Sequence, residues 1–304
     1  MSGPTLRFDR SFDPRHGEAV QVCDRVARVV AKNPGPFTFH GTNTFLVGDR
    51  DLAVIDPGPD DPAHVAALIA AIGERRVSAI LVTHTHRDHS PAARALAAAT
   101  GAPVYGEGPH RPARPLDLGE INPLDASGDH DFRPDVVLGD GDLVAGAGWT
   151  LEALATPGHT TNHLCFALRE EEAIFTGDHV MGWSTSIVAP PDGLMSDYMA
   201  SLARLQDRRE RLLLPAHGNG IAEPEEFLEA LVRHRLGREK AVLDRLAAGD
   251  ETIPDMVRVV YADVDRSLHG AAALSMLAHV EDLVGRGLVV SDGRIDLAAR
   301  YRPA

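Results

Sequence analysis

One short segment, residues 83–90 with the sequence THTHRDHS, contains three histidines and one aspartate within six consecutive positions. Neutral imidazole and carboxylate groups are preferred ligands of zinc and similar divalent ions. The segment follows a short apolar run at 79–83, so it is expected to be a loop that can spread its side chains around two ions. A solvated surface loop is the alternative, but such loops rarely concentrate histidine in this way. The candidate ligands are His84, His86, Asp88 and His89.

Three later positions have suitable chemistry in a similar setting. His159 lies in TPGHT, Asp178 in FTGD and His217 in LPAHG, each just past an apolar run and beside glycine or proline. Taken singly, each fits an ordinary turn. A β-rich sandwich that repeats its halves, however, brings the ends of its strands to one edge. We therefore predict a single two-metal site built from all seven residues.

The elements that must position these residues follow a mixed α/β pattern. Hydrophobic runs separated by Gly, Pro and Asn predict strands, and apolar residues at helical spacing predict helices. Residues 107–135 have no periodicity and are expected to form a long surface excursion. The expected strands are 26–30, 43–47, 52–55, 79–83, 150–155, 164–168, 173–175 and 212–215, and the expected helices are 62–72, 90–99 and 198–206.

The pattern changes after about residue 222. Helices are expected at 224–248, 254–261 and 268–286, followed by a β-hairpin at 288–297 around the turn residues Ser291 and Gly293. Three helices and a terminal hairpin suggest a winged helix. We therefore predict a catalytic domain at 1–222 and a winged-helix-like domain at 223–304.

Composition restricts the possible partners. The chain has 30 basic and 44 acidic residues, a net charge of −14, which repels polyanions over most of the surface. Two cysteines are too few for a disulfide framework. The N-terminus lacks an apolar signal region, and no run of 18 apolar residues occurs. A cytoplasmic protein without a membrane partner is expected.

The motif HxHxDH, followed by a separate His, Asp and His, resembles the metallo-beta-lactamase superfamily. The resemblance implies a four-layer αββα sandwich and a hydrolase with two divalent ions. Zinc is expected, with iron or manganese as alternatives. Asp56, in the sequence IDPG, would orient the ligand loop without itself binding an ion. By the family pattern, one ion would be bound by His84, His86 and His159 and the other by Asp88, His89 and His217, with Asp178 bridging the two.

A closer resemblance connects the chain with the beta-lactamase-like protein 2 group. It is carried by GTNT at 41–44, TPGHT at 156–160, GDHVMGW at 177–183 and the trailing winged helix. That group includes an endoribonuclease acting on single-stranded RNA, so phosphodiester cleavage is one expected activity. A thioester hydrolase of the glyoxalase II type is an alternative, although the C-terminal region does not resemble that enzyme's. The longer excursion and His179 depart from the animal members of the group.

The expected mechanism is hydrolysis by a metal-bridging hydroxide, with Asp88 both as ligand and as the acceptor of the water's proton. No serine or cysteine nucleophile is then required. Two further residues are expected to contact substrate. Asn43 lies on a turn and His179 directly follows the bridging aspartate, although a turn favours Asn in any case and strand alternation would point His179 away.

The winged helix leaves a non-enzymatic, nucleic-acid-binding role as a further alternative. Its last helix, however, contains Glu281 and Asp282 against Arg286, which is unsuited to phosphate contacts. Packing or formation of a homodimer is the preferred interpretation. The expected partners are therefore a small ester or thioester, or single-stranded RNA, and not duplex DNA.

Overall fold

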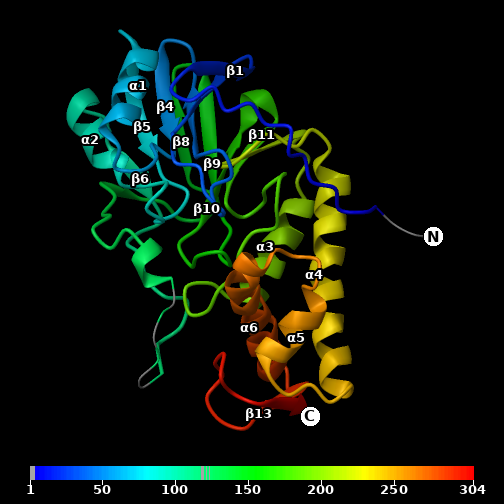
Figure 1. Cartoon of the computed structure of the whole chain (residues 1–304). Helices are drawn as coiled ribbons and strands as arrows, with labels where there is room; N and C mark the ends of the chain where they lie inside the picture. Colours follow the sequence, from blue (N-terminus) through cyan, green and yellow to red (C-terminus); the bar gives the residue numbers. More distant parts are fainter. Residues whose placement is uncertain (1–3, 118–119, 121, 123) are drawn as a thin grey trace.

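Two β-sheets form the centre of the structure. The computed structural model describes residues 4–117, 120, 122 and 124–304. The first sheet has the strand order β1-β2-β3-β4-β5-β6-β7 and the second the order β12-β11-β10-β9-β8 (Figure 1). The strands of the first sheet are β1 Ala19–Cys23, β2 Val26–Val30, β3 Asn43–Val47, β4 Asp51–Ile55, β5 Arg76–Leu81, β6 Val104–Gly106 and β7 Val136–Val137. Those of the second are β8 Leu143–Gly146, β9 Trp149–Ala155, β10 Leu164–Leu168, β11 Ala173–Gly177 and β12 Leu212–Pro215.

Strand alternation explains why these sheets are buried on both faces. On β5, Leu81 packs into the core between the two sheets, whereas its neighbour Ile80 packs against the helix side. On β10, Phe166 points between the sheets and Cys165 points to the opposite face. Side chains of a strand alternate between faces, so a run that is apolar throughout must be covered twice.

Helices cover the outer faces and complete four layers. Helices α1 (Pro62–Ile72) and α2 (Ala92–Thr100) pack on the first sheet through Leu68 and Leu96. Helices α3 (Met195–Gln206) and α4 (Pro224–Ala247) cover the second sheet through Leu202 and Leu228. The expected αββα sandwich is therefore confirmed. Helix α3 begins three residues before the predicted start at 198.

The C-terminal region forms its own core. It comprises the C-terminal end of α4 with α5 (Ile253–Val260), α6 (His269–Gly285) and the antiparallel strands β13 (Val289–Ser291) and β14 (Tyr301–Pro303). The hairpin differs from the prediction, because Ser291 pairs with Tyr301 and the second strand begins after 297. The carboxylate of Asp296 accepts the amides of Ala298 and Ala299 and ties these residues into a wider loop.

The described residues of the predicted excursion at 107–135 pack against both regions, whereas its residues 118, 119, 121 and 123 lie outside the described part of the chain. Arg114 forms ion pairs with Glu120 and with Glu281 of α6. The backbone of Gly128 forms an isolated antiparallel β-bridge with His86 of the ligand loop. The excursion thus runs beside the ligand loop and reaches the C-terminal helices. No described helix has the length and apolarity needed to cross a membrane.

Removing a buried side chain from the C-terminal core should destabilise that core. Leu283 is fully buried among the residues of α5, α6 and β14, so Leu283→Ala is expected to lower the free energy of unfolding by about 2–5 kcal/mol. Urea denaturation followed by circular dichroism measures the loss. Val259→Ala is the control, because Val259 is 52% exposed on α5. An equal, small effect of both substitutions would contradict the assigned packing.

Candidate metal centre

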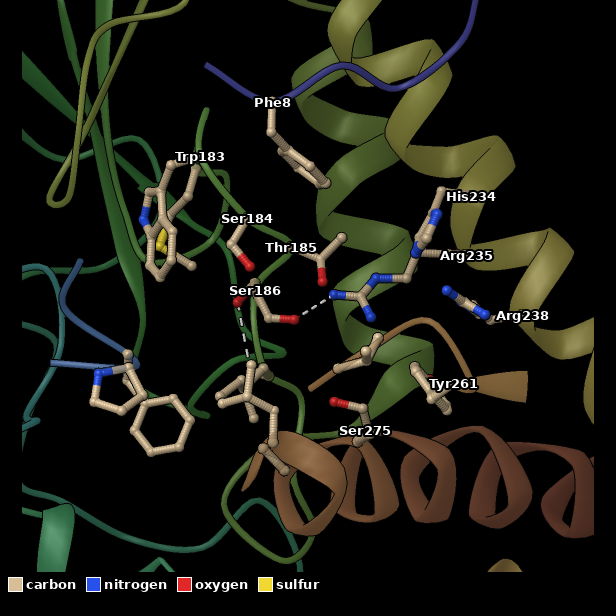
Figure 2. A pocket seen from close by; sticks show the side chains of 18 of the residues that line it. Phe8, Trp183, Ser184, Thr185, Ser186, His234, Arg235, Arg238, Tyr261 and Ser275 are labelled. Atoms are coloured by element: carbon tan, nitrogen blue, oxygen red, sulfur yellow. Dashed lines mark hydrogen bonds between the residues drawn. The ribbon is translucent and has the colours of Figure 1, made fainter. Parts of the chain in front are cut away.

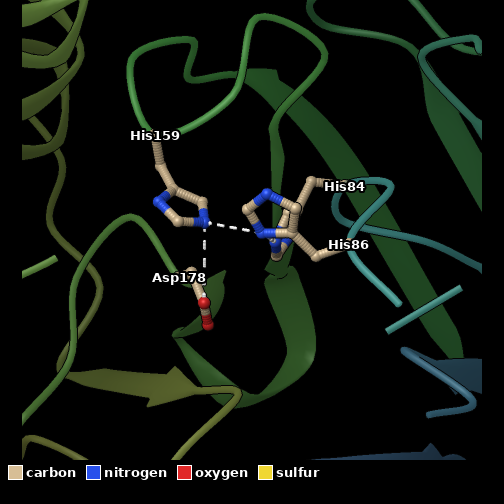
Figure 3. A group of neighbouring side chains, drawn as sticks. All are labelled: His84, His86, His159 and Asp178. Carbon is tan, nitrogen blue, oxygen red and sulfur yellow. Dashed lines mark hydrogen bonds and ion pairs between the residues drawn. The ribbon is translucent and has the colours of Figure 1, made fainter. Parts of the chain in front are cut away.

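The seven residues expected to bind metal meet at one edge of the sandwich. The loop after β5 supplies four of them, the loop between β9 and β10 supplies His159, and Asp178 and His217 follow the ends of β11 and β12. The structure gathers them into two groups in which candidate ligand atoms lie within 4.8 Å of one another. The first group is His84, His86, His159 and Asp178 (Figure 3), and the second is Asp88, His89 and His217.

Three imidazoles of the first group converge on one point. His86 Nδ1 lies 3.0 Å from His84 Nε2 and also 3.0 Å from His159 Nε2. In the second group, Asp88 Oδ2 lies 3.2 Å from His89 Nε2 and 3.3 Å from His217 Nε2. Such mutual approach of five rings and a carboxylate is what shared coordination of cations requires.

Asp178 lies between the two groups and faces both. Its Oδ2 is 3.6 Å from His159 Nε2. Its Oδ1 is 3.2 Å from His217 Nε2 and 3.6 Å from His89 Nε2. Because one oxygen faces each group, this side chain has the geometry of a bridging carboxylate.

Asp56 determines which nitrogen of two rings carries the proton. The backbone N–H and the hydroxyl of Thr83 both donate to Asp56, each at 2.8 Å. The Thr83 hydroxyl has thereby used its proton, so at 3.1 Å it can only accept from His84 Nδ1. His89 Nδ1 lies 3.0 Å from the same carboxylate and donates to it. The Nε2 lone pairs of His84 and His89 are therefore aimed at the centre.

Backbone carbonyls fix two more rings in the same tautomer. His159 Nδ1 donates to the Ile187 carbonyl at 2.6 Å, and His217 Nδ1 donates to the Gly41 carbonyl at 3.1 Å. In the neutral form of each ring, Nε2 therefore presents a lone pair to the centre. Among the described residues, no hydrogen-bond partner satisfies the buried atoms His89 Nε2, His217 Nε2 and Asp178 Oδ1, which face the centre. Converging lone pairs and orphaned polar atoms fit divalent cations well.

The electrostatics of the centre couple cation binding to protons. Burial opposes ionisation of Asp88 and Asp178, but neighbouring His89 and His217 outweigh it and hold the pKa of both carboxyls well below the usual range. Burial also disfavours the charged form of His217, yet Asp178 and Asp88 raise its pKa to about 10. A bound cation must displace the ring protons, so acid should weaken its binding.

The two residues expected to contact substrate, Asn43 and His179, are buried among other protein groups. Asn43 is buried, and its Nδ2 donates to the carbonyls of Pro215 and Gly218, so it holds the loop of His217. His179 is fully buried with its ring 4.7 Å from that of Tyr198. Both side chains are withdrawn from solvent, because the turn after β11 places His179 in the interior and the Asn43 amide is used by the loop of His217.

Sequence reasoning missed a neighbour of the centre in the excursion. His110, which was not among the candidate site residues, has its ring centroid 6.4 Å from that of His86. Its Nδ1 lies 3.0 Å from the Thr85 hydroxyl, and its Nε2 lies 3.7 Å from Asp192. The segment around it has no periodicity, so only tertiary packing brings it to the ligand loop.

Comparison with known proteins decides the family. The model of the metallo-beta-lactamase superfamily matches residues 37–217, more than half of the chain. The chain belongs to the metallo-beta-lactamase superfamily. The model of the beta-lactamase associated winged helix domain matches residues 252–298, which confirms the winged helix. The boundary at 222 remains a prediction.

Several relatives are similar to this superfamily member over both its catalytic domain and its C-terminal region. Lactamase-like protein adaB of Aspergillus niger is 31% identical over 278 residues, covering 85% of this chain and 80% of the relative. The beta-lactamase-like protein 2 homolog of Caenorhabditis elegans is 30% identical over 282 residues, covering 90% and 89%. An atrochrysone carboxyl ACP thioesterase of Aspergillus chevalieri is 32% identical over 257 residues, covering 82% and 75%. The resemblance to the beta-lactamase-like protein 2 group is thus confirmed.

Solved structures show the same fold. A metallo-beta-lactamase family protein from Thermus thermophilus has a TM-score of 0.75 at 24% identity, covering 92% of this chain and 98% of that one. A beta-lactamase domain protein from Burkholderia ambifaria has a TM-score of 0.77 at 20% identity, covering 97% and 96%. At these identities the likeness concerns the fold alone.

Asp56 should control metal affinity without itself touching a cation. Asp56→Asn keeps the size of the side chain but cannot accept from Thr83 and His89 together, so divalent metal should bind about 10- to 100-fold more weakly. Competition with a chromophoric chelator measures the affinity. Asp60→Asn, on the exposed residue four positions later, is the control. Unchanged affinity in a folded Asp56→Asn protein would contradict the positioning role.

Proposed function

We propose that this superfamily member is a dinuclear zinc hydrolase that cleaves acyl thioesters. The observation that carries the proposal is the pair of donor groups sharing Asp178, with the ring tautomers set for coordination. His84, His86 and His159 would hold one ion, and Asp88, His89 and His217 the other. Five imidazoles, two carboxylates and no thiolate suit zinc, with iron and manganese as alternatives.

The cations would lower the pKa of water toward about 7 and polarise the carbonyl of the scissile bond. Asp88 is suited to hold the proton released in the reaction. Its side chain is 25% exposed, against 10% or less for the other six, so it faces the opening of the centre. The Thr42 hydroxyl lies 3.2 Å from Asp88 Oδ2 and restrains that carboxylate.

Two observations favour a thioester over an RNA phosphodiester. The Aspergillus chevalieri relative is named as a thioesterase acting on an acyl carrier protein, and the match covers 75% of its length. A net charge of −14 also disfavours a polyanionic strand. Cleavage of single-stranded RNA remains a prediction from the beta-lactamase-like protein 2 resemblance and belongs in the same assay.

The winged helix is better suited to packing than to nucleic acid. Nine residues of α6 are buried, including Leu277 and Leu283, so the helix that would enter a DNA groove is part of a core. Its acidic residues Glu281 and Asp282 pair with Arg114 and Arg286. These contacts support an enzyme that binds no duplex DNA. A homodimer remains a prediction.

The decisive assay pairs metal content with activity on four substrates. Elemental analysis is expected to find about two zinc ions per chain. Hydrolysis of an acyl thioester is expected to be lost with chelator and restored by zinc, with slower or no turnover of single-stranded RNA, a simple phosphodiester and a β-lactam. Turnover of RNA but not of thioester would overturn the substrate class. Retention of all activity without metal would overturn the mechanism.

Asp88→Asn tests the proton acceptor. The amide keeps an oxygen for a cation but cannot take a proton, so kcat should fall by about 100-fold or more. Metal content and the unfolding transition are measured on the same preparation. Asp24→Asn, an exposed residue of the first hairpin, is the control. Full activity in a folded, metal-loaded Asp88→Asn protein would exclude this role.

A further inference from the structure

A pocket of about 260 Å³ opens between the catalytic domain and the C-terminal helices (Figure 2). Its walls come from the N-terminal segment, the loop at 181–187, α4, the region after α5, and α6. Phe8, Phe37 and Trp183 make part of the lining apolar. Arg235 and Arg238 of α4, together with Arg10 of the N-terminal segment, make another part cationic. No described acidic residue lines it, which is unusual in a chain of net charge −14.

The two arginines of α4 form no ion pair with any carboxylate that the structure describes. Arg235 is only 3% exposed, and no described carboxylate lies within ion-pair distance of it or of Arg238, whereas many other arginines of the chain are paired. Arg235 instead donates to the Ser186 carbonyl and lies over the ring of Tyr198. Arg238 donates to the Val260 carbonyl at 2.6 Å and lies over Tyr261.

Both guanidinium groups keep unused hydrogen-bonding capacity. The buried Nε atoms of Arg235 and Arg238 find no hydrogen-bond partner among the residues that the structure describes. Withdrawing an unpaired cation from water is unfavourable, and an oxyanion accepting from both groups would offset that cost. His234 adds no charge at neutral pH, because burial and then the charges of Arg238 and Arg235 lower its pKa to about 4.

The pocket is joined to the metal centre through two consecutive residues. The Ser186 carbonyl accepts from Arg235, and the next carbonyl, that of Ile187, accepts from Nδ1 of His159. Figure 2 shows the Arg235 guanidinium directed from α4 toward Ser186. Consecutive Cα atoms are about 3.8 Å apart, so the Arg235 end of the pocket lies one residue away from the support of a candidate metal ligand.

We propose that this pocket binds the phosphate on the thiol arm of the substrate, so that the enzyme selects acyl thioesters of phosphopantetheine. The assignment rests on the proposed thioester hydrolysis. Arg235 and Arg238 bind the phosphate, and the aromatic side chains at the pocket contact the uncharged part of the arm. A guanidinium fork matches the geometry of phosphate oxygens and gives charge-assisted hydrogen bonds.

Binding is measured with probes that cannot be hydrolysed. S-methyl-4′-phosphopantetheine and S-methylpantetheine differ only in the phosphate, and their thioether does not compete as a thiolate for metal. Calorimetry on the metal-loaded full chain is expected to give about tenfold or greater preference for the phosphorylated probe. Arg238→Gln should abolish the preference and Arg238→Lys should restore part of it. Arg233→Gln is the matched control, because Arg233 lies on α4 outside the pocket and pairs with Glu229.

Hydrolysis provides the second measurement and separates the two proposals. With acetyl-4′-phosphopantetheine, Arg238→Gln should raise KM about tenfold with little change in kcat, because the phosphate is remote from the scissile bond. Acetylpantetheine and acetylglutathione are the comparison substrates. Equal use of acetylpantetheine, or a preference for the carboxylates of glutathione, would overturn the phosphate site and leave thioester hydrolysis standing. Selective probe binding without any thioester turnover would keep the pocket and overturn the proposed function.

Discussion

The carboxylate of Asp56 is the interaction on which the metal centre depends. It accepts hydrogen bonds from the backbone N–H and the hydroxyl of Thr83 and from Nδ1 of His89. One side chain thus fixes both the position of the ligand loop and the tautomer of its histidines. Asp56 is 1% exposed, which prevents water from competing for these hydrogen bonds. Its backbone has a φ of 50°, a value that few residues other than glycine adopt. The local cost is offset by the network that the carboxylate completes.

Residues with a strong local pattern could be placed from the sequence. The HxHxDH loop follows a short apolar strand, so its position at the C-terminal end of a buried strand could be predicted. Asp178 and His217 lie at the ends of two neighbouring parallel strands, β11 and β12, and such ends meet at the same edge. The strands and helices that were predicted lie near the expected residues because they carry clear hydrophobic periods, whereas the four-layer sandwich followed from the family resemblance. The strands β1, β6, β7 and β8 were not predicted.

Residues whose roles depend on tertiary packing could not be placed. Asn43 and His179 sit beside the centre in sequence or in space, yet their side chains serve the loop of His217 and the core near Tyr198. His110 reaches His86 only because the excursion folds back. The terminal hairpin was misplaced because Ser291 and Gly293 resemble a tight turn, whereas the contacts of Asp296 hold a wider one. None of these contacts produces a periodic pattern of residues along the sequence.

Helix α4 makes the C-terminal region part of the catalytic unit. Leu228 and Leu231 join the core under the second sheet, while Val242 and Leu246 join the C-terminal core. Between them, Arg235 reaches the carbonyl that precedes the one orienting His159. An anion bound by Arg235 would therefore contact a group whose partner is the neighbour of the residue that orients a candidate ligand. Thermodynamic linkage then requires reciprocity: if pocket occupancy changes the affinity of the centre for its cation by some factor, the cation changes the affinity of the pocket by the same factor.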